Sequence, residues 1–98
     1  MLVVIPAAQA SIVIHEYPGL TAQSEPLAIA LGPDGNMWFA EFSANQIGRI
    51  TLSGVVHEFS IPTPASGPRG ITAGPNGELW FTELTGHPLG SIPNSGRV

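Results

Sequence analysis

The sequence predicts an all-β fold built from two consecutive four-stranded units of 42 residues each. The first reason is an internal repeat: an offset of 42 residues aligns the second half of the chain with the first without a gap, and 17 of the 42 aligned pairs are identical. Unrelated segments would share only about two or three such identities. The second reason is that Gly and Pro contribute 12 and 10 residues, and no helical period of apolar residues persists between them.

Each unit contains short segments with the composition of strands, separated by turn residues. Gly32-Pro33-Asp34-Gly35 predicts a tight turn after the first of them, because Pro presets φ and Asp-Gly tolerates left-handed backbone. The expected strands are residues 27–32, 37–42, 46–51 and 55–61 in the first unit and residues 69–74, 79–84 and 88–92 in the second.

The second strand of each unit is apolar on both sides. Met37, Trp38, Phe39 and Ala40 leave no polar side to face water. A β-propeller covers both faces of such a strand, because each four-stranded blade lies between two neighbours. We therefore predict a β-propeller fragment of two blades, and a β-solenoid is the alternative.

The blade repeats are expected to span residues 12–98, with strand regions at 12–17, 27–61 and 69–98. Residues 12–17 repeat the fourth strand of a unit. They should form the outer strand of a preceding blade or the piece that closes a ring.

Charge and hydropathy exclude two classes of partner. The net charge is −4, and the three basic residues form no stripe of the kind that nucleic-acid binding requires. No segment approaches the roughly 20 continuous apolar residues of a membrane-spanning helix. We expect neither a nucleic-acid nor a membrane partner.

Residues 1–11 are expected to be the remnant of a signal peptide or a short lead-in. Ala8-Gln9-Ala10 fits the small-x-small pattern of a cleavage site, although no positive charge precedes it. A signal peptide would make the protein secreted or periplasmic, and the alternative is a cytoplasmic protein.

Three runs of the repeat resemble the blades of the virginiamycin B lyase (streptogramin lyase) family. These are residues 47–51, 57–64 and 67–83, and the similarity extends over residues 12–98. The resemblance implies that complete relatives have seven blades, of which this chain supplies two. It also implies an antibiotic-resistance activity, in which the relatives open streptogramin B antibiotics by Mg²⁺-dependent elimination.

The resemblance implies where catalytic residues would lie. In the family, a His follows the Pro that opens an inner strand, and Glu residues before that Pro and at the end of the Trp-Phe strand hold the metal. The His positions here are Leu27 and Arg69, and neither can act as a base at neutral pH. We therefore expect no catalytic residue, with Glu25 and Glu41 as candidate Mg²⁺ ligands and Arg69 as a candidate contact for an anionic ligand.

Whether the protein is an enzyme stays open at this point. The first hypothesis is a lyase-type propeller fragment that is inactive alone. The alternative is a non-catalytic secreted propeller that binds a small-molecule or protein ligand at the mouth of its channel. In both cases the uncovered blade faces predict contact with further blades or self-association.

Overall fold

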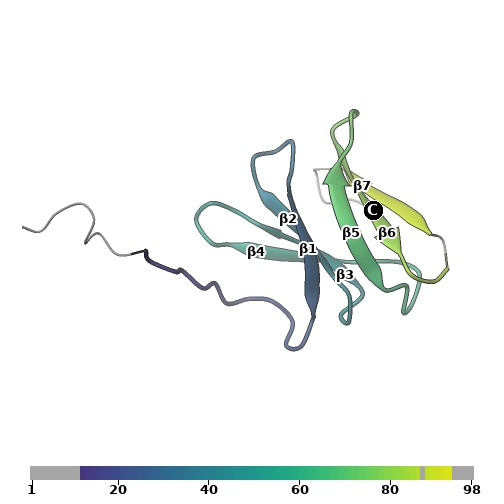
Figure 1. The fold of residues 1–98 in the computed structure, drawn as a ribbon, viewed down its shortest axis with the longest axis horizontal. Helices are drawn as coiled ribbons and strands as arrows, with labels where there is room; N and C mark the ends of the chain where they lie inside the picture. Colours follow the sequence, from purple (N-terminus) through teal and green to yellow (C-terminus); the bar gives the residue numbers. More distant parts are fainter. Residues whose placement is uncertain (1–11, 87, 94–98) are drawn as a thin grey trace, which may run out of the picture.

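The computed structural model describes residues 12–86 and 88–93, so the prediction for residues 1–11 lies outside it. Over the described residues the chain is all-β, with seven strands in two antiparallel sheets and no helix (Figure 1). Consequently no helix in the described part is long and apolar enough to cross a membrane. The prediction of an all-β propeller fragment is confirmed in its fold class.

The two sheets follow the predicted repeat closely, and every observed strand boundary lies within one residue of the expected one. Sheet neighbours are neighbours in the sequence, as in a blade built from successive hairpins. The first sheet contains β1 (Pro26–Leu31), β2 (Met37–Glu41), β3 (Gln46–Ile50) and β4 (Val56–Ser60), and the second contains β5 (Pro68–Ala73), β6 (Glu78–Glu83) and β7 (Leu89–Pro93).

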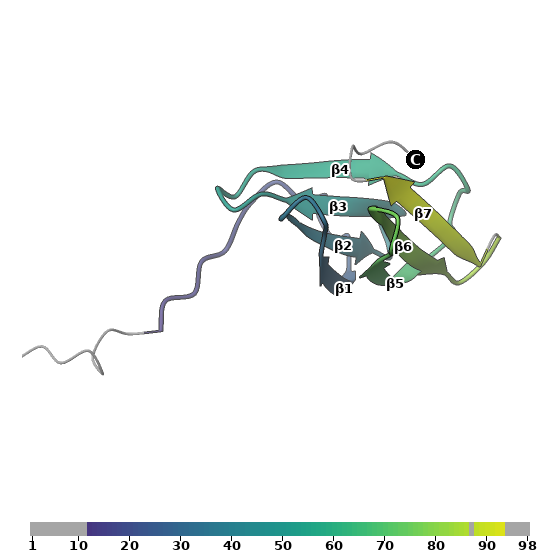
Figure 2. The same cartoon turned by 90° about the horizontal axis from the view of Figure 1, so that it is seen from above.

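Residues 12–17 depart from the prediction, because the structure places them in no sheet. Every residue of the segment is exposed, although the Tyr17 ring at its end packs on Gly54. Towards the N-terminus the segment leads away from both sheets (Figures 1 and 2). The physical reason is that its expected partner, a strand of another blade, is not among the described residues. Within the described residues, the second sheet has three strands and the first has four.

Side chains alternate between two faces of each sheet, which we name after their aromatic residues. The Phe face of the first sheet carries Ile29, Met37, Phe39 and Ile50, and its Trp face carries Trp38, Ala40, Ile47 and Phe59. A Cβ atom at Gly48 would lie 2.2 Å from the Phe39 ring, so only glycine lets this ring lie against the neighbouring strand. Gly90 and Phe81 repeat the arrangement in the second sheet.

The hydrophobic core lies between the two sheets and takes residues from both. The Trp face of the first sheet packs on the Phe face of the second sheet, where Leu79, Phe81 and Ile92 are buried. Trp38 is fully buried and stacks on Phe59 at 5.9 Å between ring centroids. Face-to-face stacking of successive repeats is the arrangement that a propeller requires.

Candidate functional site

The chain enters the first strand of each sheet through the same backbone twist. Glu25 and Gly67, which occupy equivalent positions, both have left-handed φ values of 52° and 64°. Glycine adopts this conformation without cost, whereas a Glu is strained by it. The acid that the family resemblance places before the strand-opening Pro is therefore held in a strained position in the first repeat and is absent from the second.

Leu27 and Arg69 lie two residues after Glu25 and Gly67, and both side chains are exposed. Leu27 is 51% exposed and offers no proton acceptor. The Arg69 guanidinium lies over the Phe42 ring at 5.3 Å, a cation–π contact that still leaves the side chain exposed. His15 and His57 are also exposed, on the N-terminal segment and on β4, and His87 lies outside the described residues.

Glu25 and Glu41 have different surroundings. The Glu25 carboxylate accepts a hydrogen bond from the Ser43 hydroxyl. Glu41, at the end of β2, is fully buried on the Phe face. Mg²⁺ usually keeps several waters, and the buried Glu41 offers no room for them. This arrangement does not fit a Mg²⁺ ion shared by the two carboxylates, and the described residues contain no group of three or more potential metal ligands. The magnesium site stays a prediction.

The structure instead brings Glu41 together with Glu58 of β4, a contact that the sequence reasoning missed. Gly48 lies between them in the sheet, and its missing side chain makes the room, since a Cβ there would lie 2.9 Å from Glu41 Oε2. Neither carboxyl oxygen of Glu41 has a donor at normal hydrogen-bond geometry. The hydrogen bond between Glu41 and Glu58 must therefore use a proton carried by the Glu41 carboxyl group.

Burial, followed by the Glu58 carboxylate, raises the pKa of Glu41 to about 8. Burial alone would also raise the pKa of Glu58, but hydrogen bonds from Glu41 and from Thr21 lower it below its ordinary value. Thr21 donates to the two Glu58 oxygens from its backbone N at 2.9 Å and its Oγ1 at 3.0 Å. At neutral pH the pair therefore holds one proton, on Glu41, and one negative charge, on Glu58.

A sequence signal for this pair exists in the repeat. The first unit has a set of three residues: a strand-end Glu, a Gly seven residues later and a second Glu ten residues after that. This set is Glu41, Gly48 and Glu58. Glu83 and Gly90 repeat its first two members, and Glu16 repeats Glu58. The spacing alone does not reveal the pair, because the register of β2, β3 and β4 decides which side chains meet.

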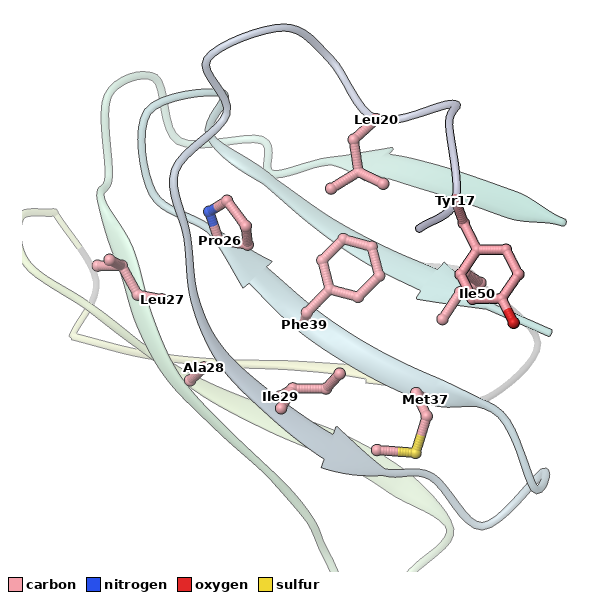
Figure 3. Close-up of a pocket in the computed structure, with 9 residues that line it drawn as sticks. All are labelled: Tyr17, Leu20, Pro26, Leu27, Ala28, Ile29, Met37, Phe39 and Ile50. Atoms are coloured by element: carbon pink, nitrogen blue, oxygen red, sulfur yellow. The ribbon is translucent and has the colours of Figure 1, made fainter. Parts of the chain in front are cut away.

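The Phe face of the first sheet holds an open apolar pocket of about 560 Å³ (Figure 3). Its walls come from β1, β2 and β3 and from the segment before β1, and they include Tyr17, Leu20, Ile29, Met37, Phe39 and Ile50. The same face of the second sheet is buried against the first sheet. The pocket is thus the uncovered form of a surface that is covered one repeat later.

The comparison with known proteins agrees with this geometry. The sequence profile of the virginiamycin B lyase family matches residues 5–98. This chain belongs to the virginiamycin B lyase family. A search of curated proteins found no match.

Solved structures of this family superpose on the chain. Selenomethionine-substituted virginiamycin B lyase from Staphylococcus aureus is 51% identical with a TM-score of 0.82, over 85% of this chain and 28% of the lyase. A catalytically inactive variant of virginiamycin B lyase from the same organism, crystallised with quinupristin, is 51% identical with a TM-score of 0.81, again over 85% and 28%. A streptogramin B lyase is 44% identical with a TM-score of 0.83, over 87% and 28%. The chain thus spans little more than a quarter of these lyases.

Proposed function

We propose that this chain supplies two blades to a virginiamycin B lyase-type propeller that acts on streptogramin B antibiotics, and that it has no lyase activity on its own. The 44–51% identity to lyases, one of which was crystallised with quinupristin, supports the substrate class. The proposed lack of lyase activity rests on the two exposed side chains at the strand entrances, Leu27 and Arg69.

Elimination at an ester bond needs a base within hydrogen-bond reach of the proton that leaves. Leu27 cannot accept a proton, and the Arg69 guanidinium carries only hydrogen-bond donors and no acceptor. Glu41 is protonated at neutral pH and buried, so it cannot replace the missing base. If Mg²⁺ binds in the assembled protein, it would supply electrophilic stabilisation of the developing charge. Glu25, with its more exposed carboxylate, is the member of the predicted pair that could contribute to such a site.

Arg69 is the residue of this chain that we expect to meet a ligand. Its cation is held over the Phe42 ring at 5.3 Å and remains exposed. A guanidinium donates hydrogen bonds to carboxylate or carbonyl oxygens, which a cyclic depsipeptide carries in number. This observation also favours the second candidate function, in which the blades bind a ligand without transforming it.

Incubation of the purified chain with Mg²⁺ and quinupristin tests the proposal. We expect no ring-opened product. Liquid chromatography with fragmentation mass spectrometry is the readout, because elimination inside a ring leaves the mass of the antibiotic unchanged, whereas hydrolysis adds a water. The S. aureus lyase is the positive control. Turnover by the unmodified chain that is lost in Glu25→Gln or Glu41→Gln but retained in Glu78→Gln would contradict the proposal.

Calorimetric titration of the same chain with quinupristin tests the ligand role of Arg69. Binding without turnover that weakens at least about tenfold in Arg69→Ala would support the binding function. Equal affinity of the wild type and the variant would remove Arg69 from the ligand site.

A further inference from the structure

The outer edge of β7 is open. Among the described residues the second sheet has the order β5-β6-β7, and no strand pairs with the far side of β7. In the first sheet that place is taken by β4. An open strand edge presents unpaired N–H and C=O groups that can accept a strand from another chain.

Residues 12–17 repeat the sequence of β4, the strand that holds this place in the first sheet. His15-Glu16-Tyr17 aligns with His57-Glu58-Phe59 of β4. Before it stand three consecutive apolar residues, Ile12, Val13 and Ile14, which are 95%, 66% and 80% exposed. Such a run of exposed β-branched side chains favours burial in a sheet.

The register of β3 with β4 fixes how this segment would pair with β7. Gly48 faces Glu58 and Arg49 faces His57, so the repeat places Glu16 opposite Gly90 and His15 opposite Ser91. Glu83, which repeats Glu41, has a buried Oε1 atom without a hydrogen-bond partner. Glu16 would lie beside Glu83 as Glu58 lies beside Glu41, so the buried Glu83 oxygen would gain a polar neighbour.

The two sheets also expose complementary faces. The Phe face of the first sheet is the open pocket of Figure 3. On the Trp face of the second sheet, Trp80 is half-buried and Leu89 is 58% exposed. Within the chain these two kinds of face are packed against each other, the Trp face of the first sheet on the Phe face of the second. The occupant that fits each open face is therefore the opposite face of another copy.

Tyr17 would take part in both contacts between copies, the strand pairing with β7 and the packing of one sheet face on another. Its ring already packs on its own first sheet, where a Cβ at Gly54 would lie 2.7 Å from it, yet the residue remains 49% exposed. Tyr17 repeats Phe59, which stacks on Trp38 at 5.9 Å. The equivalent partner of Tyr17 is Trp80 of another copy.

We propose that copies of this chain associate head to tail: residues 12–17 of one copy form the fourth strand of the second sheet of the next, and the Phe face of its first sheet covers that copy's Trp face. The segment and β7 lie at opposite ends of the molecule in both views, so the donor is a second copy (Figures 1 and 2). The contact joins two different surfaces, and repeated use of it gives a ring or an open chain.

Paired cysteine substitutions in the full 98-residue chain test the register, since the natural sequence has no Cys. The double variant His15→Cys, Ser91→Cys should form disulfide-linked dimers and larger species under mild oxidation. The matched control Val13→Cys, Ser91→Cys places the thiol on the same side of the strand but two residues out of register. We expect at least about tenfold less cross-linking in the control, because two residues shift the thiol by about 7 Å.

Mixing two copies that carry different mass tags, each with one of the two cysteines, distinguishes the possible outcomes. A disulfide between the tags supports the proposal. An intramolecular bond in the double variant, equal yields in the two variants, or exclusively symmetric His15→Cys dimers would overturn it. His15 and Val13 are exposed and outside both sheets, and Ser91→Cys replaces one small side chain of β7 by another of similar size.

Discussion

Replacement of Trp38 by Ala is expected to lower the free energy of unfolding by about 3–5 kcal/mol, the range for truncating a large buried aromatic residue. Trp38 is fully buried, stacks on Phe59, and donates from its indole N–H to Asp34 Oδ1 at 3.0 Å. Its loss opens a cavity at the contact between the two sheets, which is also the centre of the core. Urea unfolding followed by circular dichroism, at one fixed protein concentration, measures the change.

The matched control for this experiment is Trp38→Phe. Phe retains a ring for the stack on Phe59 and loses the hydrogen bond to Asp34, so we expect a cost of roughly 1–2 kcal/mol. A Trp38→Ala variant within about 1 kcal/mol of the wild type would show that the sheets do not pack on this residue.

The stability of the chain should fall as the pH rises from about 4.5 to about 8, owing to Glu41. The folded pKa of Glu41 is raised from its ordinary value of 4.5 to about 8. The folded state therefore binds a proton in this window that the unfolded state has released, and stability falls by up to about 1.4 kcal/mol per pH unit. Glu58 acts in the opposite direction: its pKa is lowered, so its contribution is lost at more acid pH.

Glu41→Gln isolates this effect, because Gln resembles the protonated acid and does not titrate. The groups that face Glu41 are Glu58 on β4 and, around the pair, Ser24, Thr21 and Gln46. We expect the variant to be at least as stable as the wild type at pH 8 and to lose the dependence on pH in this window, whereas Glu78→Gln should retain it. An unchanged pH profile in Glu41→Gln would mean that Glu41 is ionised in the folded protein.

Much of the fold follows from the sequence because the repeat reports on the same structure twice. Gly-Pro turns and the doubly apolar Trp-Phe strand recur 42 residues apart, so each repeat supports the strand boundaries of the other. Each predicted strand within residues 27–92 was found. Residues 12–17, which were predicted to be a strand, are not in a sheet. A β-strand needs a partner strand, and the sequence does not say which chain provides it.

The candidate site was less accessible to prediction. The resemblance named Glu25 and Glu41 as joint candidate Mg²⁺ ligands, but side chains in a sheet point to one face or the other. Glu41 turns over Gly48 towards Glu58, and the left-handed backbone at Glu25 directs that residue to Ser43. Register across three strands decides such contacts, and a repeat alignment fixes register only after one sheet is known.

Multi-angle light scattering on the purified 98-residue chain tests the central claim most directly, namely that two blades with open faces do not form a closed fold alone. Propellers close with about four or more blades, and here both outer faces are apolar and, among the described residues, both sheets end in unpaired edge strands. We predict a mass that is a multiple of 10.2 kDa and that falls on dilution. A single 10.2-kDa species at every concentration, with one cooperative thermal transition, would contradict the account.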